Sequence, residues 1–250
     1  MRLTGRRLTA LAALAVGAIS AVYASAGAPI VGVPALVALL ALAGVLSASN
    51  RHAAAMLAAV AAALIPIVAG WAQASPLVGL LAFAMLLWRR PDRKPLVARP
   101  PVSAWLYGLV AVLAVLVFAL WWHQSFIAIS PGSFGWSRPR LPVDGLPLMM
   151  AVVVCAAAVN ALFEELLWRV VLADLPGERV SGGLAWPVLV SAAFGLSHLH
   201  GTPGGWIGVA ATFCFGLAMV ALRRFAGGSI VVCVVAHFAA DLILLWGLYG

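Results

Sequence analysis

The sequence predicts an all-α polytopic membrane protein, built as a bundle of eight or nine transmembrane helices. Of its 250 residues, 65% are hydrophobic and only 9% are charged, and the mean hydropathy is +1.11. An ordinary soluble domain carries about 25% charged residues. Lipid offers the backbone no hydrogen-bond partners, so a spanning segment must be a helix or part of a closed barrel. The long unbroken apolar runs indicate helices.

Charge clusters and Pro/Gly punctuation divide the chain into nine apolar segments. They are residues 8–26, 29–48, 53–72, 75–88, 103–122, 147–172, 184–200, 204–222 and 229–249. The segment 75–88 is shorter than the roughly 20 residues of a full span, so the count stays at eight or nine. Residues 1–28, with a basic start and an apolar core, also resemble a signal peptide with a cleavage site at Ala24-Ser25-Ala26.

The basic residues predict the orientation. With nine spans, most of the 15 Lys and Arg residues lie on the side of the N-terminus, and Arg138 and Arg140 lie opposite. The positive-inside rule therefore predicts a multi-pass cell-membrane protein with its N-terminus inside. The pI of about 10.7 arises from these clusters and does not indicate a nucleic-acid partner. The cysteines lie in apolar runs without CxxC spacing, so they are predicted to pack.

Six ionisable side chains lie inside predicted spans, where each costs about 2.5 to 3.5 kcal/mol to insert. They are Glu164, Glu165, Arg169, His198, His237 and Asp241. At 1.5 Å per residue, Glu164 and the two histidines lie about 12 to 20 Å from the inner ends of their spans, in one layer with Asp241. Glu165 with Arg169, and His237 with Asp241, are four residues apart and share a helix face. Three helices can therefore direct polar groups to one buried point.

Each of these residues has a structural alternative: a buried salt bridge, a packing histidine or a capping aspartate. Taken together, three carboxylates and two imidazoles exceed what is needed to neutralise Arg169, which favours a functional site. His52, His123 and His200 are assigned to span ends. Ser197 is assigned to helix packing, because no GxSxG motif surrounds it.

A carboxylate and an imidazole that reach one water can polarise it for attack on a carbonyl, while a second donor pair stabilises the oxyanion. This chemistry hydrolyses a peptide bond without a serine or cysteine nucleophile. Alternatively, Glu and His side chains can hold a divalent metal such as zinc. No HExxH motif is present, so a metal is possible but not required.

The segments EELLWR, FGLSH and HFAAD fit the patterns EExxxR, FxxxH and HxxxN/D in order and spacing. Over roughly residues 147–249 the chain resembles the CAAX protease and bacteriocin-processing family of intramembrane endopeptidases. The resemblance implies a membrane-embedded or lipid-modified peptide substrate within the lipid bilayer. It also implies that Glu164 is the general base, that His198 shares the water, and that His237 and Asp241 form the oxyanion side.

Asp241 departs from the family pattern, which often has asparagine at this position. An ionised aspartate only accepts hydrogen bonds and would repel an oxyanion. Asp241 is therefore either protonated or orients His237 as an imidazolium, and we favour the second option. The two glutamates are predicted to differ, because Glu165 faces Arg169 and Glu164 is rotated about 100° away.

The resemblance implies three regions along the chain. Residues 1–100 are N-terminal helices for scaffolding or substrate access, residues 101–146 hold a helix and an outer loop, and residues 147–250 hold the catalytic helices. The loop 123–145, rich in Pro, Gly and aromatic residues, suits an interfacial cap or lid. Two other functions stay open: a proton-coupled or small-molecule transporter, and a non-catalytic peptide-binding or immunity protein.

Overall fold

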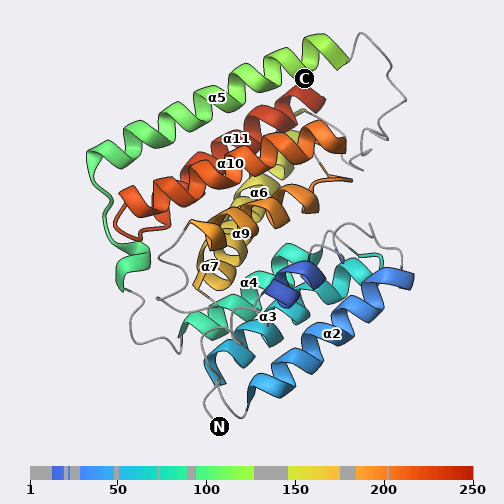
Figure 1. The fold of residues 1–250 in the computed structure, drawn as a ribbon. Helices are drawn as coiled ribbons and strands as arrows, with labels where there is room; N and C mark the ends of the chain where they lie inside the picture. The colour runs from blue at the N-terminus through green and yellow to red at the C-terminus, as the bar shows by residue number, and fades with distance from the viewer. Residues whose placement is uncertain are drawn as a thin grey trace. The chain divides into compact units, whose positions relative to one another are not determined.

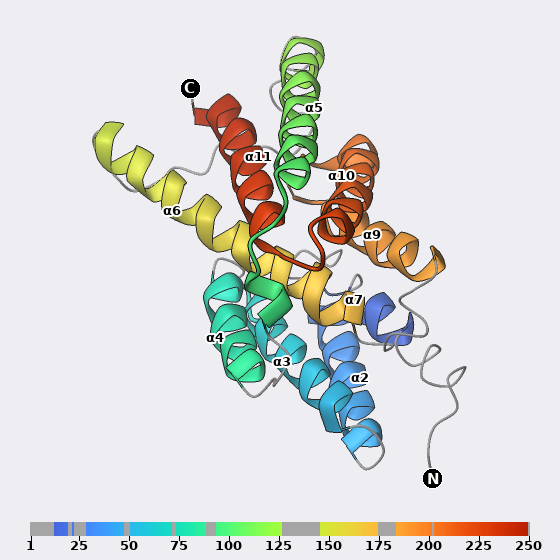
Figure 2. The ribbon, with the colours of Figure 1, turned by 90° about the vertical axis from the view of Figure 1, so that its left-hand side faces the viewer.

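The computed structural model describes residues 13–19, 22, 29–47, 51–71, 74–88, 94–126, 146–174, 184–201 and 203–249. Within these ranges every regular element is a helix, which confirms the all-α fold class (Figures 1 and 2). The possible cleavage site at Ala24-Ser25-Ala26 and the basic residues Arg138 and Arg140 lie outside the described residues, as does the loop beyond residue 126.

Each predicted span from 29–48 onward contains one main helix. In chain order the elements are α2 (Pro29–Ser47), α3 (Arg51–Val68), α4 (Ser75–Trp88), the short 3-10 helix η2 (Lys94–Val97), α5 (Val102–Phe126), α6 (Leu146–Glu164), the π-helix η3 (Glu165–Val171), α7 (Leu172–Asp174), α9 (Ala185–Ser197), α10 (Gly205–Phe225) and α11 (Val231–Tyr249). Two helix ends differ from prediction. α5 continues beyond residue 122 to Phe126, and α9 ends at Ser197 rather than near residue 200.

Four of the described helices are long and apolar enough to cross a membrane. They are Arg51–Val68, Val102–Trp122, Pro147–Val171 and Gly205–Phe225. The other predicted spans among the described residues contain shorter apolar helices. Only 11% of the Val102–Trp122 stretch is buried within the chain, so most of this apolar helix is left to face lipid. These observations confirm a membrane protein, and the number of spans stays a prediction.

The helices group into two compact units that do not follow chain order. The first unit comprises Met1–Lys94 and Phe163–Val220, and the second comprises Pro95–Leu162 and Ala221–Gly250. In the first unit α2 packs on α3 and α3 packs on α4 (Figure 1). Its hydrophobic core joins Leu57 and Leu64 of α3 to Leu167, Trp168 and Phe194. The N-terminal helices therefore share a core with the segment that carries EELLWR.

Phe163 anchors the start of this segment to α4. Its ring stacks on Phe83 with centroids 5.9 Å apart and an interplanar angle of 7°. A Cβ atom on Gly79 would overlap the Phe163 ring and lie 3.1 Å from the Ala63 Cβ atom. The absence of a side chain at Gly79 makes this contact possible. Because Phe163 precedes Glu164, α4 helps to set the position of the glutamates.

In the second unit α5 packs along α11. A Cβ atom on Gly108 would lie 3.2 Å from Val232, so glycine allows the two helices to approach closely. The start of α11 is tied to the residues that precede α5, because the Ile230 N–H donates to Leu96 O at 2.9 Å. The Ser229 hydroxyl also donates to Ala98 O at 2.7 Å.

The contact at Gly79 predicts an effect on stability. We expect Gly79→Ala to lower the free energy of unfolding by about 1 to 3 kcal/mol, because the added methyl group displaces the Phe163 ring. Gly44→Ala is the matched control, since a Cβ atom there meets nothing within 4 Å. Thermal unfolding in detergent measures both variants. An equal effect of the two substitutions would contradict the proposed clamp on Phe163.

Candidate functional site

The segment that carries the two glutamates changes helix type. α6 ends at Glu164, and Glu165–Val171 continues as a π-helix. The Leu172 N–H donates to Leu167 O, five residues back. Such wide turns are rare in proteins, and those that occur often lie at functional sites. The predicted segment 147–172 is therefore helical, but it changes from an α-helix to a π-helix at Glu165.

The π-helix is buried on almost every side. Six of the seven residues in the π-helix are buried, and only Leu166 is not fully enclosed. An α-helix of this length on a protein surface usually exposes one face. The wider turn directs Glu165, Trp168 and Arg169 into the core of the first unit.

Arg169 and Glu165 form a buried ion pair, as their spacing predicts. Arg169 Nε lies 3.5 Å from Glu165 Oε2, and the two side chains are 2% and 0% exposed. The guanidinium carbon also lies 4.5 Å from the centroid of the Phe194 ring, in a cation–π contact. The buried Arg169 charge is therefore stabilised by the Glu165 carboxylate and by the face of the Phe194 ring.

Phe194 links this ion pair to His198. Its ring lies edge-on to His198, with centroids 4.8 Å apart at 73°, and edge-on to Trp168 at 5.5 Å and 62°. Phe194 is 1% exposed. Phe194 is the first residue of the FGLSH motif. Its ring packs between the Arg169 guanidinium and the His198 imidazole, a contact that the motif alone does not reveal.

His198 caps the C-terminal end of α9 instead of lying within a longer span. α9 has 13 residues, so its length is about 20 Å, less than the roughly 30 Å thickness of a bilayer core. Gly195 allows α9 to approach α10, because a Cβ atom there would lie 2.7 Å from Val209 O. The chain then turns at once, and the Gly201 N–H donates to His198 O at 3.0 Å.

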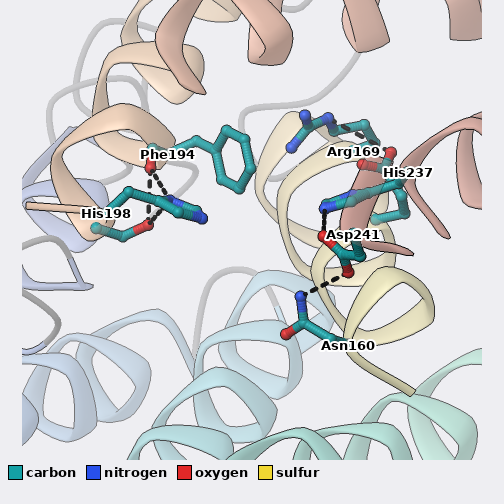
Figure 3. Close-up of polar contacts among 8 residues, drawn as sticks. Asn160, Arg169, Phe194, His198, His237 and Asp241 are labelled. Carbon is teal, nitrogen blue, oxygen red and sulfur yellow. Dashed lines mark hydrogen bonds and ion pairs between the residues drawn. The ribbon is translucent and has the colours of Figure 1, made fainter. Parts of the chain in front are cut away.

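The backbone of α9 orients the His198 ring (Figure 3). His198 Nδ1 lies 3.0 Å from Phe194 O and 3.2 Å from the Ser197 hydroxyl, which itself donates to Phe194 O at 2.7 Å. A carbonyl oxygen only accepts, so the neutral ring carries its proton on Nδ1 and keeps a lone pair on Nε2. Ser197, assigned to helix packing from the sequence, thus also contacts the His198 ring.

The second unit holds another polar group (Figure 3). His237 Nε2 lies 3.6 Å from Asp241 Oδ1, and the side chains are 4% and 16% exposed. The Asn160 amide donates to Asp241 Oδ2 at 3.1 Å. The sequence analysis missed Asn160. The available signal was an amide inside the apolar run of α6, where a polar side chain needs a partner.

The predicted site residues thus fall into two sets. Glu164, half-buried at the end of α6, belongs to the first unit with Glu165, Arg169 and His198. His237 and Asp241 belong to the second unit. That the two sets meet in one layer stays a prediction. Among the described residues no group of three or more His, Cys, Asp or Glu side chains is arranged to hold a metal ion.

The predicted packing role of the cysteines holds in part. Cys233 is buried, whereas Cys155 and Cys214 are exposed. Their helices α6 and α10 are among those apolar enough to cross a membrane, so exposed thiols there are left to face lipid.

The buried ion pair predicts a stability effect. We expect Arg169→Met to lower the free energy of unfolding by about 3 to 5 kcal/mol, because it leaves the Glu165 carboxylate buried without its cation. The double variant with Glu165→Gln should recover most of this loss. Thermal unfolding in detergent tests the series. If the two single effects simply add in the double variant, the pair is not coupled.

Comparison with known families supports this reading of the motifs. Residues 146–243 match the family model described as Type II CAAX prenyl endopeptidase Rce1-like. No match was found among curated proteins or among solved structures. The matched segment contains all six ionisable residues singled out in the sequence, and the match supports a membrane protease. Residues 146–243 are therefore an Rce1-like domain of the CAAX protease and bacteriocin-processing family.

Proposed function

We propose that this protein is an intramembrane endopeptidase that cleaves a peptide bond in a membrane-associated protein or peptide with water activated by Glu164 and His198. The observation that carries the proposal is the family match over residues 146–243, which include the three motifs. The Glu165–Arg169 and His237–Asp241 pairs add support, because ionisable side chains inside membrane helices commonly mark functional sites.

The two glutamates have different roles in this proposal. Glu165 is fully buried and lies against Arg169, so it serves to position the π-helix. Glu164 is half-buried and acts as the general base that takes a proton from the attacking water. His198 Nε2, with its lone pair, accepts a hydrogen bond from the same water. The oxygen of the water then forms a bond to the carbonyl carbon of the substrate.

His237 and Asp241 act on the carbonyl oxygen. Asp241 lies against His237 Nε2, so the proton on Nδ1 of the imidazolium can be donated to the oxyanion. The contact favours an aspartate that orients His237 over one that donates directly. When the carbon–nitrogen bond breaks, the proton taken by Glu164 passes to the leaving amine nitrogen.

The same proposal covers the surroundings of the reaction. The substrate is a membrane-embedded or lipid-modified peptide, and the protein is a multi-pass cell-membrane protein with its N-terminus inside. The regions 1–100, 101–146 and 147–250 are assigned to scaffold or access helices, a helix with an outer loop, and the catalytic helices. In this proposal, side chains carry out each step of the hydrolysis, and no step requires a metal ion.

Loss of the general base is the first test. We expect Glu164→Gln to abolish cleavage while the protein stays folded, because the amide keeps the shape of the side chain and removes the base. General-base catalysis is worth about 10²- to 10⁴-fold in rate. Mass spectrometry of membrane peptides, from cells with the wild-type or the Glu164→Gln protein, detects products that disappear.

Glu165→Gln is the matched control one residue along the chain. It should lower thermal stability more than Glu164→Gln does. If Glu164→Gln keeps full cleavage while Glu165→Gln abolishes it without loss of fold, the two roles are reversed. Cleavage in detergent also separates a protease from a transporter, since transport needs two compartments.

The tautomer of His198 is a second, independent test. We expect the neutral form of the His198 ring to carry its proton on Nδ1, because the Phe194 carbonyl at 3.0 Å only accepts. Solid-state NMR of the ¹⁵N-histidine-labelled protein in lipid reports the tautomer, and the spectrum of His198→Gln assigns the signals. A neutral ring protonated at Nε2 would contradict the proposed role of that nitrogen.

A further inference from the structure

The Asn160 side chain has no place in the reaction described above, and yet it contacts one of its residues. Asn160 lies on α6, 81 residues before Asp241 on α11, and its amide donates to Asp241 Oδ2 at 3.1 Å. Both residues belong to the second unit. A contact between two helices from distant parts of the sequence is set by tertiary packing.

We infer that Asn160 is a positioning residue that holds the Asp241 carboxylate so that its other oxygen faces His237. The inference rests on the proposed function in one respect, because it takes the action of His237 on the substrate carbonyl from there. Asn160 itself touches no reacting atom in this arrangement.

The two oxygens of Asp241 receive different donors (Figure 3). Oδ2 accepts from Asn160 Nδ2, whereas Oδ1 lies 3.6 Å from His237 Nε2. The first distance is that of a hydrogen bond, and the second is longer than the usual 2.7 to 3.2 Å range of one. The contact with His237 is therefore weaker than the hydrogen bond from Asn160. The hydrogen bond from Asn160 therefore contributes to holding the carboxylate with Oδ1 toward His237.

The chemistry of an amide suits this position. An asparagine donates a hydrogen bond without adding charge, so it stabilises the ionised form of Asp241. The Asp241 side chain is 16% exposed, so water competes little for its oxygens. A carboxylate at position 160 would instead repel Asp241, and an apolar side chain would leave Oδ2 without this donor.

Three variants of the full chain test the inference in detergent. Asn160→Leu removes the donor at similar volume, and Asn160→Asp introduces repulsion. The third variant combines Asn160→Asp with Asp241→Asn, which exchanges donor and acceptor at constant net charge. Its amide at position 241 can donate to position 160 through nitrogen and accept from His237 through oxygen.

We expect both single variants to lower kcat by roughly ten- to a hundredfold. Losses of this size are typical when a residue that orients a catalytic group, without touching the substrate, is removed. KM should change little, because Asn160 does not contact the substrate. The exchanged double variant should recover a large part of the kcat lost in Asn160→Asp. If the contact had only a structural role, the variants would lower thermal stability but would not lower kcat at an unchanged KM. Single variants with wild-type kcat, or a double variant no better than Asn160→Asp, would overturn the inference.

A readout without activity separates this inference from the proposed function. In ¹⁵N-histidine NMR of the protein in lipid, the His237 signals should shift in Asn160→Leu and return toward wild type in the exchanged double variant. His237→Gln assigns the signals, and His198 serves as the internal reference. If the wild-type protein cleaves no peptide but the His237 signals respond, only the proposed function fails. If the His237 signals are the same in all variants, the positioning role fails.

Discussion

The burial of the Arg169 charge is the constraint on which the first unit depends. A guanidinium that is 2% exposed needs an anion and a favourable neighbour, since removing it from water costs several kcal/mol. Glu165 supplies the anion and the Phe194 ring supplies the face. The π-helix directs both members of the ion pair inward, and the Phe194 ring brings α9 against them. The position of His198 at the end of α9 follows from the same contacts.

Local partners orient the polar side chains of both units. His198 is held by the backbone carbonyl of Phe194 and by the Ser197 hydroxyl within its own helix. Asp241 is held by Asn160 from another helix. Preorganised donors and acceptors lower the cost of arranging charge during a reaction. This pattern fits a hydrolytic site better than a set of charges that only neutralise one another.

The N-terminal helices carry no motif of the family, and the Rce1-like match begins at residue 146. Their part in the molecule becomes clear from the core, in which residues of α3 and α4 share one hydrophobic cluster with Phe163 and the π-helix. The sequence gives no reason for a glycine at position 79. The structure gives one, because a side chain there would overlap the Phe163 ring. Residues far away in the sequence therefore pack against the segment that carries Glu164 and Glu165 and hold it in place.

The sequence by itself determined the all-α membrane class, the approximate positions of the helices and the pairing of Glu165 with Arg169. These follow from local rules, because lipid forces the backbone of an apolar run to bond within itself and residues four apart on a helix are neighbours. Only the tertiary structure decided the π-helix, the end of α9 at Ser197, the ring of Phe194 between Arg169 and His198, and the hydrogen bond from Asn160 to Asp241. Each of these depends on packing between helices distant in the sequence, which helical periodicity along a single segment does not encode.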